Sequence, residues 1–110
     1  MISTEFESWK LHDALLDWVE ILWEKKLCRF YVHAFVEKGK DATPHILELE
    51  NVTAINVPHE EPWGPSFFIN KVKFESGVFQ IQMQSGDVIA VTSTGYSFTP
   101  SNHTMKADEK

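Results

Sequence analysis

Two short clusters of histidine and carboxylate side chains are the residues in this sequence best suited to chemistry. His12 and Asp13 lie near the start of the chain, and His59 lies beside Glu60 and Glu61 in a proline-containing segment. Imidazole and carboxylate groups are common ligands of zinc and other divalent metals, so together the clusters would suit a metal-assisted hydrolase. The ligand spacing of known metal motifs is absent, and adjacent strand residues point to opposite faces. We therefore favour solvated polar residues, no cofactor and a non-enzymatic protein.

A second kind of candidate is a surface that binds through aromatic or amide groups. Trp63 lies in residues 58–65, where three prolines exclude a central strand. An exposed indole there would stack on a sugar ring or anchor a partner protein, whereas a buried one would close the end of a β core. The glutamines Gln80, Gln82 and Gln84 would either bind hydroxyl-rich ligands or form a hydrated sheet face.

Residues 67–92 contain the clearest secondary-structure pattern. In residues 78–84, apolar side chains alternate with three glutamines, as expected for a strand with one buried face. Short segments rich in serine and glycine flank this strand and are typical of hairpin turns. The sequence therefore predicts an antiparallel meander of strands at 67–75, 78–84 and 88–92, with Asp87 in the second turn.

The first half of the chain has a less regular pattern. Apolar residues in 11–26 fit either helical or strand spacing. We favour a short helical or irregular entry at 13–17 followed by a strand, with a continuous helix over 11–26 as the alternative. Strands are also predicted at 27–36 and 46–57. Three further tryptophans are expected to be packing residues: Trp9, Trp18 and Trp23.

Together these elements predict a mainly β fold, an antiparallel β-sandwich or partly open barrel of six to seven strands with at most a short N-terminal helix. The alternative is an α+β fold in which an N-terminal helix packs on an antiparallel sheet. The length of 110 residues suits a single domain, which we place at residues 1–100, with polar residues 101–110 as a flexible tail. An exposed edge strand would allow a homodimer to form by strand pairing.

Charge and cysteine content restrict the classes of function. The 16 acidic and 10 basic residues give a net charge of −6, and the scattered lysines lack the basic stripe that binds nucleic acid. An acidic surface instead favours a basic protein partner. No apolar run approaches the ~20 residues of a membrane-spanning helix, and no export signal is evident. The single Cys28 fits a reduced, cytoplasmic setting.

Three short motifs resemble those of small uncharacterised bacterial proteins. They are L-H-D-A at 11–14, W-G-P-S at 63–66 and Q-S-G-D-V-I at 84–89. In those proteins a short H-D-x element precedes an antiparallel sheet that ends in S-G-D-x-I. The resemblance points to His12, Asp13 and Asp87 as places to look for a site. Some similar small acidic proteins act as immunity factors beside toxins, which implies an immunity-like role by analogy.

The sequence thus favours a small acidic protein-interaction domain that uses Glu60, Glu61 and Trp63. A β module that binds a small molecule or carbohydrate is the alternative, and the metal-assisted hydrolase has the least support.

Overall fold

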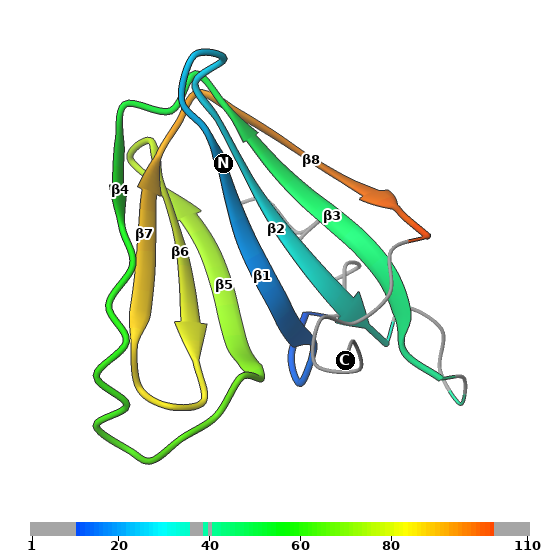
Figure 1. The fold of residues 1–110 in the computed structure, drawn as a ribbon. Coiled ribbons are helices and arrows are strands. Elements are labelled where there is room, and N and C mark those ends of the chain that lie inside the picture. Colours follow the sequence, from blue (N-terminus) through cyan, green and yellow to red (C-terminus); the bar gives the residue numbers. More distant parts are fainter. Residues whose placement is uncertain (1–10, 36–38, 40, 103–110) are drawn as a thin grey trace.

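The computed structural model describes residues 11–35, 39 and 41–102, and all regular secondary structure in this part of the chain is β-strand. Two four-stranded antiparallel sheets face each other, with strand orders β1-β2-β3-β8 and β4-β7-β6-β5 (Figure 1). The mainly β, sandwich-like fold predicted from the sequence is confirmed. The strands are β1 (Leu15–Leu22), β2 (Leu27–Ala34), β3 (Thr43–Glu50), β4 (Ala54–Asn56), β5 (Ile69–Glu75), β6 (Val78–Met83), β7 (Val88–Thr92) and β8 (Gly95–Pro100).

The core lies between the inner faces of the two sheets. In β2 and β6 every second side chain is buried, because successive strand residues point to opposite faces. Phe30 in the first sheet and Phe79 in the second are both fully enclosed. The other fully buried large side chains come from both sheets as well: Leu47, Leu49, Ile69, Ile81, Val32 and Val91.

Backbone hydrogen bonds join the two sheets where β1 and β5 begin. The Leu16 amide donates to the Phe67 carbonyl at 2.8 Å, and the Ile69 amide donates to the Ala14 carbonyl at 2.7 Å. A β-bridge between Leu15 and Phe68 lies between these bonds, and Figure 1 shows the two strands side by side here. The sandwich is therefore partly closed along this side, as in the partly open barrel that we considered.

The entry to β1 contains a turn and no helix. Asp13 has a left-handed φ of 69°, and β1 begins two residues later. The prediction of a strand in this region is confirmed, and the alternative of a continuous helix over 11–26 is wrong. The predicted entry at 13–17 is too long, because β1 already begins at Leu15. A β-bulge between Leu16 and Trp18 shifts the alternation by one residue, so Leu16 and Val19 both pair with buried residues of β2. Leu16 and Val19 are three residues apart, as are residues on one face of a helix, so the sequence also fits a helical pattern.

The described residues contain eight strands, where the sequence predicted six to seven. Residues 46–57 form two strands because the chain turns at Asn51, which has a φ of 54°, and crosses from the first sheet to the second. Residues 95–100 add β8. The meander of β5, β6 and β7 is confirmed, with Ser76 and Gly77 both at positive φ in its first turn.

Two predictions fall partly or wholly beyond the described residues: the tail at 101–110 and the packing role of Trp9. The described part of the chain contains no helix with the length and apolar character needed to cross a membrane.

Candidate functional site: an apolar pocket between the sheets

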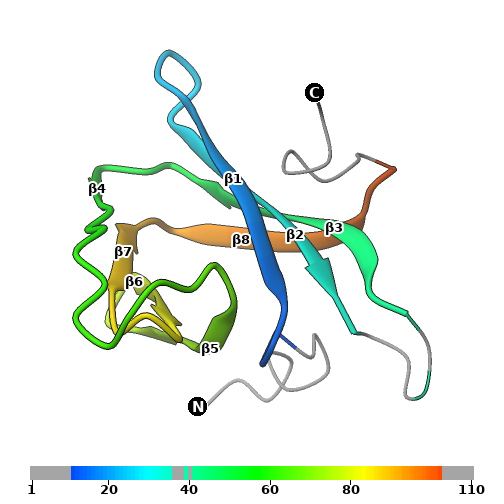
Figure 2. The ribbon, with the colours of Figure 1, turned by 60° about the horizontal axis from the view of Figure 1, so that its bottom comes forward.

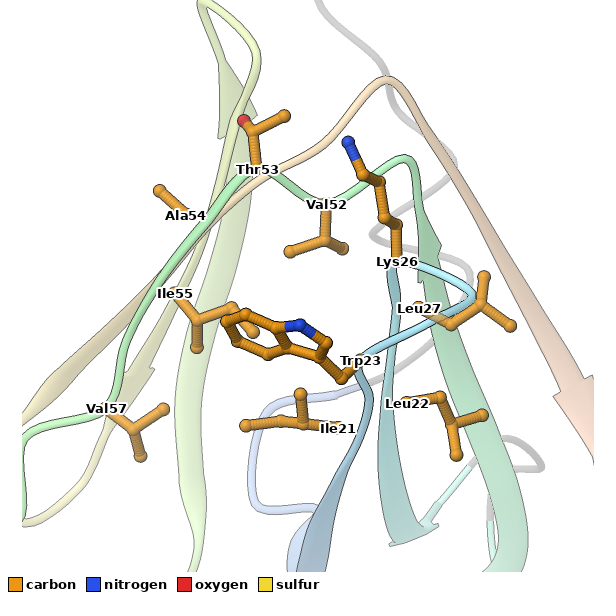
Figure 3. A pocket seen from close by; sticks show the side chains of 10 residues that line it. All are labelled: Ile21, Leu22, Trp23, Lys26, Leu27, Val52, Thr53, Ala54, Ile55 and Val57. Atoms are coloured by element: carbon orange, nitrogen blue, oxygen red, sulfur yellow. The ribbon is translucent and has the colours of Figure 1, made fainter.

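An apolar pocket of about 720 Å³ lies between the β1–β2 hairpin and the segment that contains β4 (Figure 3). One wall belongs to the first sheet and the other to the second. The β1–β2 hairpin projects past the neighbouring strands (Figure 2). The lining residues are Ile21, Leu22, Trp23, Lys26, Leu27, Val52, Thr53, Ala54, Ile55 and Val57.

Three large apolar side chains of the pocket are exposed to solvent. Trp23 is 87% exposed, Ile21 50% and Val57 45%. Single exposed hydrophobic residues are ordinary, but a group that meets at one hollow is characteristic of binding surfaces. The Trp23 indole extends across the middle of the pocket (Figure 3). An apolar ligand would therefore remove a large area of the indole from water.

Backbone hydrogen bonds hold the two walls of the pocket together. The Lys26 amide donates to the Trp23 carbonyl at 3.2 Å and closes the hairpin turn. The Lys26 carbonyl accepts from the Val52 amide at 2.9 Å, which connects this turn to the chain that leads into β4. Ile55 in turn is paired with Val91 of β7. Backbone hydrogen bonds of the fold therefore fix both walls of the pocket.

Sequence reasoning missed this pocket. Trp23 was predicted to be a packing residue, but the structure places it in solvent. The available signal was its position directly before the polar turn at residues 24–26, since an aromatic side chain at a hairpin tip has little core to enter. Trp18 does pack, with its ring stacked on Tyr31 at a centroid distance of 4.2 Å.

Asp87 anchors the proline loop (residues 58–65) to the turn between β6 and β7. Its buried carboxylate accepts hydrogen bonds from the Glu60 amide at 2.8 Å, the Glu61 amide at 3.0 Å and the Ser85 hydroxyl at 2.8 Å. Desolvation raises the pKa of Asp87, but these bonds and the nearby His59 outweigh it, so the pKa lies below its ordinary value. This predicted site residue has a structural role in the described fold.

Trp63 lies on the outside of the same loop. Its amide donates to the Ser85 carbonyl at 2.9 Å, and its ring covers Gly86, where a Cβ atom would lie 2.8 Å from Trp63 Cδ2. The residue is nevertheless 66% exposed. Of the two arrangements considered from the sequence, the exposed one is observed, because the indole rests on the turn without entering the core.

His59 and Glu61 of the proline loop lie beside a second, smaller hollow of about 360 Å³. His59 Nε2 is 3.2 Å from Glu61 Oε2, and both side chains line the hollow with Phe67 and Phe68. The Glu60 residue is exposed. These residues therefore form a mixed polar and aromatic surface next to the loop.

His12 and Asp13 connect the segment before β1 to the second sheet through hydrogen bonds. His12 Nδ1 lies 2.7 Å from the Asn70 carbonyl oxygen, and the Asp13 carboxylate accepts from Gln84 Nε2 at 2.6 Å. The Gln82 side-chain oxygen accepts from Asn70 Nδ2 at 3.0 Å. Two of the three predicted glutamines thus bond to neighbouring residues. Gln80 and Gln82 belong to β6, which lies between β5 and β7 and is not an edge strand, and Gln84 follows it in the turn.

The structure does not assemble the two histidine clusters into one centre. Among residues 11–35, 39 and 41–102, no three His, Cys, Asp or Glu side chains are grouped as a metal site would require. The pairing of His12 and Asp13 with His59 and Glu60, on which the hydrolase hypothesis depended, is therefore not observed.

The outer face of the first sheet carries an ionic network that the sequence analysis did not identify. Arg29 Nε donates to Glu48 at 2.8 Å, and the Tyr31 hydroxyl donates to Glu20 at 2.7 Å. The hydrogen bond to Glu48 is the main cause that raises the pKa of Arg29 above its ordinary value. These are cross-strand contacts between β1, β2 and β3, so we interpret them as support for the sheet.

Comparison of the chain with protein-family models, curated proteins and solved structures gives no match. The function must therefore be inferred from the pocket and from the surfaces described above.

Proposed function

We propose that this protein is a non-enzymatic β module that binds a small apolar molecule in the pocket between the β1–β2 hairpin and β4. The observation that carries the proposal is the convergence of the exposed Trp23, Ile21 and Val57 side chains on a pocket of about 720 Å³. Small-molecule pockets typically measure about 300–1,000 Å³ and are lined mainly by apolar and aromatic side chains. Both properties favour a small ligand of largely apolar character.

The indole supplies enough area for measurable affinity. A fully enclosed tryptophan buries about 150–250 Å², and Trp23 is 87% exposed. A ligand that covers half of the exposed ring would hide roughly 90 Å², which corresponds to about 2 kcal/mol at ~25 cal/mol per Å². Ile21, Ile55 and Val57 would add further contacts from both walls.

A calorimetric titration with decyl alcohol tests this proposal. We expect saturable binding to the wild type and a weaker interaction with Trp23→Ala. Trp63→Ala is the matched control, because Trp63 is also largely exposed but does not line the pocket. Equal affinities in all three proteins would refute the assignment of the pocket as the binding site, and the absence of any binding would refute the proposed function.

A second candidate function is docking of a basic protein, as in the immunity-like role suggested by analogy. The observation that favours it is the exposed Trp63 on a loop that Asp87 holds in place, next to the exposed Glu60. Aromatic anchors flanked by charges are common in protein interfaces, and charge steers association. The buried Cys28 thiol supports a reducing, cytoplasmic setting for either function.

The docking function is tested with a basic protein captured from lysate by the purified chain. Its association rate should fall, and depend less on salt, when Glu60 and Glu61 are both replaced by lysine. Association that is just as fast at low salt with the charge-reversed variant would exclude steering by this loop.

A further inference from the structure

Lys26 gives one end of the pocket a positive charge. Among the described residues that line the pocket, Lys26 is the single charged side chain, and none is acidic. The whole chain has the opposite balance, with 16 acidic and 10 basic residues. The local charge at the pocket is therefore opposite in sign to that of the whole protein.

The position of Lys26 in its turn also calls for an explanation. Its φ of 55° lies in the left-handed region, a backbone conformation that glycine and asparagine adopt at a lower energetic cost than lysine. Both of its backbone groups are engaged, with Trp23 and Val52, so the start of its side chain is fixed relative to the pocket. Within the described ranges, no carboxylate forms an ion pair with the exposed Lys26 ammonium.

We propose that the ligand is an amphipathic anion, whose apolar body covers the Trp23 indole and whose head group pairs with the Lys26 ammonium. This inference rests on the proposed function and specifies its ligand class. Lys26 and Thr53 lie at one end of the pocket, with Ile21 and Val57 at the other (Figure 3). A carboxylate at the first end would accept hydrogen bonds from the Lys26 ammonium.

The experiment compares three ligands of equal chain length by calorimetry: decanoate, decyl alcohol and decyltrimethylammonium. At neutral pH and low salt, we expect the wild type to bind decanoate roughly three- to tenfold more tightly than decyl alcohol, and the cation most weakly. Added salt should reduce the preference for decanoate and leave the affinity for decyl alcohol nearly unchanged.

Lys26→Met removes the charge and keeps most of the apolar stem, and Lys25→Met is the matched control on the same turn. The Lys26 variant should bind decanoate no more tightly than decyl alcohol, whereas the Lys25 variant should behave like the wild type. Equal, salt-independent binding of decanoate and decyl alcohol by the wild type would overturn the anion proposal and leave the pocket function intact. Failure to bind any of the three ligands would overturn both.

Discussion

Replacement of Trp23 by alanine should weaken ligand binding strongly and lower the stability of the fold only slightly. Because Trp23 is 87% exposed, the fold hides only about an eighth of the roughly 200 Å² that a buried tryptophan contributes, or ~25 Å². At ~25 cal/mol per Å², the loss of this burial destabilises the protein by about 0.6 kcal/mol. The loss of about 2 kcal/mol of ligand contact corresponds to a roughly 30-fold weaker Kd. The variant should therefore fold normally and bind poorly.

Urea unfolding followed by far-ultraviolet circular dichroism measures the free energy of unfolding of Trp23→Ala without relying on tryptophan emission. Phe30→Ala provides the scale, because Phe30 is fully buried and its truncation should cost about 3–5 kcal/mol. Calorimetric titration with decyl alcohol measures the binding term. A loss of more than about 2 kcal/mol of stability in Trp23→Ala would show that the indole packs in the core, and an unchanged affinity would show that the ligand does not cover it.

Three further predictions concern the loop, its anchor and the core. Gly86→Ala should lower the free energy of unfolding in urea by about 1–3 kcal/mol more than Gly77→Ala does. Both glycines have positive φ, but only a Cβ at Gly86 would lie 2.8 Å from the Trp63 ring and 2.9 Å from a proline. Equal losses in the two variants would contradict the placement of Trp63 over Gly86. The lowered pKa of Asp87 means that its ionised form stabilises the fold above the ordinary value of 3.8, and that this contribution disappears as the pH falls from there through the folded-state pKa. The stability difference between wild type and Asp87→Asn should accordingly shrink in acid-dependent unfolding curves, and a constant difference would refute the anchor role. Burial raises the pKa of Cys28 to about 11, so Ellman's reagent should react with the folded protein far more slowly than with the urea-unfolded chain.

The meander of β5, β6 and β7 was predictable because its signals are local. Alternating apolar residues in β6 and turn residues at Ser76 and Gly77 act over a few neighbouring positions. The bulge after Leu16 was not predictable, since it depends on how β1 pairs with β2 and it disguises the strand period.

The candidate site depended on contacts between distant segments, which a single sequence does not specify. The pocket exists because the tip of the β1–β2 hairpin faces Ile55 and Val57 across the gap between the sheets. Asp87 was predicted as a binding-site residue from its turn, but its bonds to amides 26 and 27 residues earlier in the chain could not be predicted. Residue types in the sequence marked Asp87 as a candidate, but only the contacts of the fold show its structural role and bring the pocket residues together.

The most direct test of the pocket as a binding site is a methyl NMR titration of the intact protein with decanoate. We predict saturable shifts for Ile21, Ile55 and Val57, which line the pocket. The signals of Ile46, on the outer face of the first sheet, and of the exposed Val88 should stay in place. Shifts that are confined to Val88, or that rise without saturation across the whole protein, would contradict the account.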